Sequence, residues 1–113
     1  MNTRTITRIV RYLLGGGFTL FGLNGFLQFL PQPPAPAAAM SFGAALIATG
    51  YMFPLIKSTE VIAGLLLLSN RYVTLALALL APVLVNILAF HVFLAPAGLP
   101  IPIVLLAAEL YLA

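Results

Sequence analysis

Long apolar runs alternate with short breaks along the chain, and the breaks consist of prolines, glycines and a few charged residues. A helix needs about 20 mainly apolar residues to cross the hydrocarbon core of a bilayer. The pattern predicts spanning helices over residues 9–30, 51–69, 72–94 and 98–113. The last run is short, so this helix either begins near Ala97 or stops inside the membrane. The expected fold is an all-α membrane protein, a four-transmembrane-helix bundle in which residues 1–113 form one domain.

The segments between and within these runs carry their own signals. Residues 1–7 form a polar tail, and residues 31–39 contain four prolines within six positions, which a helix cannot continue through. Residues 40–49 are apolar but too few to span, so we expect a short interfacial or re-entrant helix there. Pro82 predicts a kink in the third crossing. Five glycines of the first crossing are expected to let a neighbouring helix approach closely: Gly15, Gly16, Gly17, Gly22 and Gly25.

Composition favours lipid over water as the surroundings of the chain. Hydrophobic residues make up 63% and charged residues 6%, against about 45–50% and about 25% in typical soluble domains. The absence of cysteine excludes disulfides, thiolate metal sites, iron–sulfur clusters and thiol catalysis. The single histidine, His91, cannot provide bis-histidine haem ligation. We therefore expect no metal site and no cofactor held covalently or by metal coordination.

The few charges predict an orientation. With four crossings, Arg4, Arg8, Arg11 and Arg71 all lie on one side, whereas the two opposite connections carry no lysine or arginine. The positive-inside rule then puts both termini of this multi-pass protein in the cytoplasm. The expected location is the plasma (inner) membrane of a bacterium. A competing arrangement with residues 40–56 as a crossing separates Arg71 from the other arginines, and we reject it on charge.

Lys57 and Glu60 lie near the middle of the second predicted crossing. A charge at bilayer depth costs about 2.5–3.5 kcal/mol even on lenient scales, so an ionisable pair there is by default a functional-site hypothesis. The two residues are three positions apart and can pair on one helix face. Two interpretations stay open, a structural pair that holds the bundle together and a ligand or proton site.

Other polar residues are expected in the same region. The candidates for ligand binding or proton relay are Lys57, Glu60, Asn24, Gln28, Asn86, His91 and Glu109. Helical rise puts the amides and the histidine in the outer half of the bundle and Glu109 near the middle of the fourth crossing. These positions predict a polar pocket open to the non-cytoplasmic side. Each residue also has a plainer explanation: interhelical hydrogen bonds for the amides, an interfacial position for the histidine, and a helix end for Glu109.

Three segments resemble the DoxX-like family of small four-helix membrane proteins: FGLNGFLQFLP, TGYMFPLIKSTEVIAGLLLLSNR and LLAPVLVNILAFHVFLAPAGL. The resemblance implies that Glu60 is the intramembrane acidic position of the second helix, and that Asn24, Asn86 and His91 fall in recurring segments. Namesakes of the family are associated with quinone-linked sulfur oxidation in membranes, and other members with oxidoreductase partners. Similar proteins usually extend the last helix into a charged tail, and this chain departs from that pattern.

Two functional hypotheses follow. The first is an accessory or structural subunit of a larger membrane redox complex, respiratory or photosynthetic, because the chain is small, rich in helix-packing glycines and without a cofactor ligand set. Its partners would be the lipid bilayer and other membrane protein subunits, and not nucleic acid, which needs a folded basic surface.

The second hypothesis is a protein that binds or transfers a quinone or another small molecule. The ligand, a quinone or a lipid, would occupy an outer-leaflet polar pocket around Lys57 and Glu60, where Glu60 and His91 accept or relay protons. No catalytic activity of its own and no catalytic residue are expected under either hypothesis. A transporter is a weaker third option, because four helices are few for a lumen.

Overall fold

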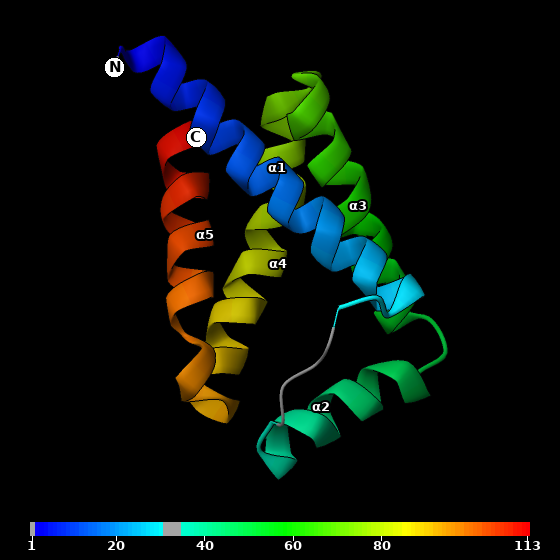
Figure 1. Ribbon diagram of the computed structural model, residues 1–113. Helices are drawn as coiled ribbons and strands as arrows, with labels where there is room; N and C mark the ends of the chain where they lie inside the picture. The colour runs from blue at the N-terminus through cyan, green and yellow to red at the C-terminus, as the bar shows by residue number, and fades with distance from the viewer. Residues whose placement is uncertain (1, 31–34) are drawn as a thin grey trace.

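The computed structural model describes residues 2–30 and 35–113, and within these ranges helices joined by short turns make up the chain, without a strand. These residues form five α-helices, which are labelled in Figure 1, and one short 3₁₀ turn. Their bounds are α1 Thr3–Leu27, α2 Ala37–Ala48, α3 Met52–Ser69, α4 Val73–Leu94, η1 Pro96–Gly98 and α5 Pro100–Leu112. The all-α prediction is therefore confirmed.

Two of the described helices, α3 and α4, are long and apolar enough to cross a membrane. With 22 residues α4 is about 33 Å long, and with 18 residues α3 is about 27 Å long. The other apolar helices, α2 and α5, have 12 and 13 residues and are too short to span by themselves. The bundle of four crossings stays a prediction.

The first helix differs from the expected one at both ends. It begins at Thr3 and not after a polar tail, because the Asn2 carboxamide oxygen accepts a hydrogen bond from the Thr5 N–H at 2.9 Å and caps the first turn. It ends at Leu27 and not at residue 30, because Gln28 adopts the left-handed conformation while its N–H still donates to the Asn24 carbonyl.

Two later boundaries, and the course of α4 at Pro82, also bear on the expectations. Within the proline-rich break, residues 31–34 lie outside the described residues, and α2 already begins at Ala37. The last helical stretch opens with η1 at Pro96, in agreement with the alternative that places its start near Ala97. Helix α4 runs unbroken across Pro82.

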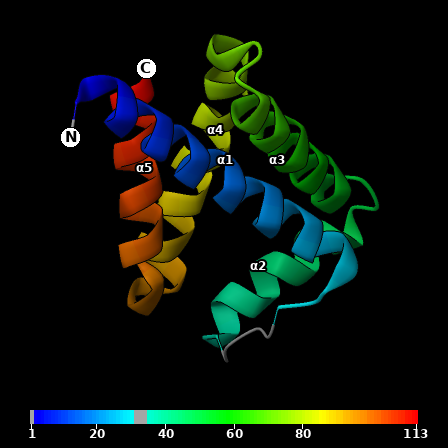
Figure 2. The ribbon, with the colours of Figure 1, turned by 45° about the horizontal axis from the view of Figure 1, so that its top comes forward.

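Helix α1 lies obliquely across the bundle, from beside the end of α5 to the start of α3, as Figures 1 and 2 show. The Thr7 and Tyr111 hydroxyls are hydrogen-bonded at 3.1 Å, so the two ends of the chain meet. The Arg11 guanidinium donates to the Leu67 carbonyl near the end of α3. The N-terminal arginines and Arg71, which follows α3, therefore gather at one end of the bundle.

Glycines set the distance between α1 and α3. A Cβ placed on Gly15 would lie 2.9 Å from the Gly64 carbonyl oxygen, and one on Gly22 would lie 2.6 Å from the Val61 side chain. The two backbones thus approach to a distance that only glycine permits. The prediction of a close approach is confirmed for Gly15 and Gly22, whereas a Cβ on Gly17 would meet only Leu105 at an ordinary 3.7 Å and Gly16 faces open space. The core beside this contact includes Leu14, Phe18, Ala63, Leu67, Leu80 and Leu84.

Candidate functional site

The predicted pair of Lys57 and Glu60 forms on the first half of α3. The Lys57 ammonium lies 3.4 Å from Glu60 Oε2, and Glu60 is only 2% exposed. The lysine stem passes over Gly25 of α1, where a Cβ would come within 2.6 Å of its methylenes. Its ammonium lies 5.7 Å from the centre of the Phe53 ring. The Glu60 carboxylate is thus buried at the α1–α3 contact, beside a lysine whose side chain is 22% exposed. Loss of the lysine would leave an uncompensated buried charge.

Asn24 and Gln28 shape the end of α1. The Asn24 carboxamide oxygen accepts a hydrogen bond of 2.7 Å from the Leu30 N–H, and Asn24 is buried. Gln28 is exposed and occupies the left-handed cap position. The expectation that both side chains share one helix face is wrong, because the helix ends between them. Their observed contacts are those of a helix terminus.

His91 lies near the end of α4, apart from the ion pair. Its Nδ1 is 2.8 Å from the Ile87 carbonyl oxygen, and its ring meets the Phe90 ring edge-on at 5.1 Å between centres. A Cβ placed on Gly98 would lie 2.6 Å from the imidazole. His91 therefore packs against the η1 turn and fixes the connection between α4 and α5.

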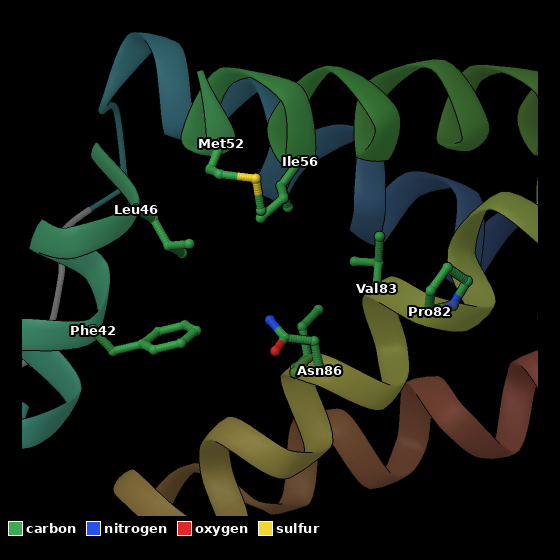
Figure 3. Close-up of a pocket in the computed structure, with 8 residues that line it drawn as sticks. Phe42, Leu46, Met52, Ile56, Pro82, Val83 and Asn86 are labelled. Carbon is green, nitrogen blue, oxygen red and sulfur yellow. The ribbon is translucent and has the colours of Figure 1, made fainter. Parts of the chain in front are cut away.

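A cavity of about 430 Å³ lies between α2, α3 and α4. Asn86 is the one predicted candidate among its lining residues, and Figure 3 shows the Asn86 amide directed into the cavity, facing Phe42 of α2. The lining comprises Phe42, Leu46, Met52, Ile56, Pro82, Val83, Asn86 and Ile87. Neither Lys57 nor Glu60 lines this apolar cavity, and the polar pocket predicted around them stays a prediction.

Glu109 lies at the opposite end of the bundle, beside the first turns of α4, and lines a second cavity of about 350 Å³. It is 7% exposed, and its Oε1 is buried without a hydrogen-bond partner in the part of the chain that the structure describes. The expectation that it lies near the middle of the last helix is wrong. Helix α5 ends at Leu112, so Glu109 falls in the last turn of that helix.

Sequence reasoning assigned no role to Arg11 beyond its charge. Its guanidinium donates to the Leu67 carbonyl at 2.5 Å and to the Leu68 carbonyl at 3.4 Å. It also lies 4.8 Å from the centre of the neighbouring Tyr12 ring. A cation is favourable at a helix C-terminus, where the carbonyl groups lack helical partners. Only the crossing of α1 and α3 reveals this contact, since nothing in the local sequence predicts it.

No cluster of three or more histidine, aspartate or glutamate side chains suited to a metal ion occurs among the described residues. Comparison of the chain with known protein families, curated proteins and solved structures finds no match. The resemblance to the DoxX-like family therefore stays a prediction.

Proposed function

We propose that the chain crosses a bacterial plasma membrane four times, with α1, α3, α4 and residues 96–112 (η1 continued by α5) as the crossings and both termini in the cytoplasm. Large apolar side chains exposed on all four helices support this, because a nonpolar environment accommodates them better than water. They include Leu13, Leu20, Ile62, Leu65, Leu75, Val85, Ile103 and Leu110. The gathering of four arginines at one end supports the orientation.

We further propose that the protein binds a hydrophobic small molecule with a hydrogen-bonding carbonyl, such as a quinone head group, in the cavity beside Asn86. The observation that supports this proposal most directly is the Asn86 amide, which is directed into an otherwise apolar cavity of about 430 Å³ (Figure 3). This volume lies within the range of about 300–1,000 Å³ that is usual for ligand pockets. A carboxamide NH₂ can donate to a carbonyl oxygen, and the apolar walls suit a ring.

The buried ion pair fits this proposal as a second component. Ile56 lines the cavity, and Glu60 follows it by four residues, which is one helical turn further along the same face of α3. A ligand in the cavity would therefore lie one turn from the carboxylate. In this proposal Asn86 contacts the ligand, and the ion pair supports the site.

Binding of a short-chain quinone to the detergent-solubilised protein tests the proposal. Asn86→Leu removes one hydrogen bond, worth about 0.5–1.5 kcal/mol, so the affinity should fall about two- to twelvefold. Thr59→Val is the matched control, because its hydroxyl bonds to the Leu55 carbonyl of its own helix and does not line the cavity. Absence of saturable binding, or equal affinity of all three proteins, would contradict the proposal.

A second candidate is an accessory subunit of a membrane redox complex, favoured by one face of α1. Ile9, Leu13, Leu20 and Leu27 are exposed along one stripe of that helix, and Gly16 leaves a notch within it where a Cβ would meet nothing within 4 Å. Such a notch lets a partner helix approach closely. Native mass analysis after mild detergent extraction should then detect a partner that Gly16→Leu releases, and a protein that always migrates alone would count against it.

A further inference from the structure

Glu109 is a buried carboxyl group whose hydrogen bonds are incomplete within the chain. The only other acidic residue, Glu60, is paired with Lys57, whereas Oε1 of Glu109 is buried with no partner among the described residues. Buried polar groups in native proteins are nearly always hydrogen-bonded, so an orphan oxygen calls for an explanation. Because Glu109 also lines a cavity of about 350 Å³, a bound group is the simplest one.

The walls of that cavity differ along its length. Near Glu109 lie the first turn of α4, with the Thr74 hydroxyl, and the last residues of the chain. Further along α4 the wall consists of Leu77, Ala78 and Ala81, of which the two alanines are exposed. The cavity therefore continues from a polar end into an apolar groove with small side chains, which has room for a hydrocarbon chain.

The position of the polar end indicates a membrane surface. Glu109 precedes the end of α5 by three residues and lies beside Val73, where α4 begins. If α4 and α5 are crossings, both of these points lie near the headgroup level, where Arg71 is exposed two residues before Val73. A carboxylate and a guanidinium at the same level of the membrane form the charge pattern that complements an ammonium next to a phosphate.

We propose that this cavity binds a membrane lipid through a primary ammonium headgroup, as in phosphatidylethanolamine. The ammonium donates to Glu109 and the Thr74 hydroxyl, Arg71 accompanies the phosphate, and an acyl chain follows Leu77, Ala78 and Ala81. The inference rests on the proposed crossing of the membrane but not on the quinone site, which lies at the opposite end of the bundle. A primary ammonium is preferred to a quaternary one because only the former carries N–H donors for the orphan oxygen.

The test reconstitutes the full chain in nanodiscs that contain equal amounts of phosphatidylethanolamine, phosphatidylcholine and phosphatidylglycerol, and measures the lipid retained by native mass spectrometry after extraction. The wild type should retain the ethanolamine lipid about tenfold over the choline lipid, a ratio in the range expected for hydrogen bonds to a charged group. Glu109→Gln keeps the shape but removes the charge and should erase the preference. Ala78→Leu fills the groove and should reduce retention of every lipid, while Thr59→Val should behave as the wild type.

Four results would overturn the inference. The first is equal retention of the ethanolamine and choline lipids, and the second is an unchanged preference in Glu109→Gln, provided that its melting temperature matches the wild type. The third is binding of free octylamine at Glu109 without any lipid preference, which would identify a soluble amine as the ligand. The fourth is a preference for the ethanolamine lipid that disappears when a co-purifying protein is removed. This result would assign Glu109 to a lysine of that protein.

Alkaline carbonate extraction separates this inference from the proposal on which it rests. A chain that is released from the membrane by carbonate does not cross it, and both proposals then fall. A chain that stays in the membrane but shows no headgroup preference leaves the crossings intact and removes only the lipid site.

Discussion

Gly15 of α1 and Gly64 of α3 face each other so closely that a Cβ on Gly15 would lie 2.9 Å from the Gly64 carbonyl oxygen. This contact brings the two helices together beside the buried Leu67, whose Cβ would lie equally near. A side chain at either position must push the backbones apart, and the packed interior around them yields little.

Alanine at Gly15 and at neighbouring Gly16 should therefore have opposite effects. Gly15→Ala should destabilise the protein by about 1–3 kcal/mol, the usual cost of overpacking. Gly16→Ala should be neutral or stabilising by up to about 1 kcal/mol, because it raises helix propensity where no atom lies within 4 Å. Thermal unfolding in one detergent measures both, and equal effects of the two variants would contradict the packing described here.

Lys57 and Glu60 should behave as a coupled pair. Lys57→Met leaves the buried Glu60 carboxylate without its cation and should cost about 3–5 kcal/mol. Adding Glu60→Met to that variant should restore part of the loss, since two apolar groups replace two charges. A double-mutant cycle on unfolding free energies checks this, and strictly additive effects would show that the pair contributes no coupling.

Arg11 should contribute to stability through α3 and not through its charge alone. Arg11→Gln removes the bonds to the Leu67 and Leu68 carbonyls and should cost about 1.5–3 kcal/mol. Arg8→Gln removes the same charge from an exposed position one turn earlier and should change stability by less than about 0.5 kcal/mol. Melting temperatures of the two variants check this. If Arg11→Gln and Arg8→Gln melt at the same temperature, the contact of Arg11 with α3 does not stabilise the protein.

The features that depend on local spacing were predictable from the sequence. Apolar runs indicated the helices, and the three-residue spacing of Lys57 and Glu60 indicated their pairing. The glycines of the first helix indicated a close contact, although only the structure separates Gly15, which is needed there, from Gly16, which is not. That distinction depends on which side of α1 faces α3.

The composition of the candidate site was harder to predict. The sequence positions indicated how deep each side chain lies along its helix, but not in which direction it points around the helix axis. Asn86 and His91 are five residues apart, so their side chains differ by about 140° around α4. Accordingly one lines the cavity and the other packs on η1. Glu109 was misplaced for another reason: even the predicted range 98–113 puts it nearer the end of the helix than the middle, and α5 ends three residues after it, at Leu112.

The four crossings are the central claim, because the cavity beside Asn86 and the lipid site beside Glu109 both depend on membrane insertion. The chain has no cysteine, so a single introduced cysteine reports its own side of the membrane. The exposed positions for this are Thr5, Ala38, Ser69 and Ala97. In intact cells, an impermeant maleimide should label Ala38→Cys and Ala97→Cys, whereas Thr5→Cys and Ser69→Cys should react only after lysis. Labelling of Thr5→Cys and Ala38→Cys from the same side, or of Ser69→Cys and Ala97→Cys from the same side, would contradict the four-crossing arrangement.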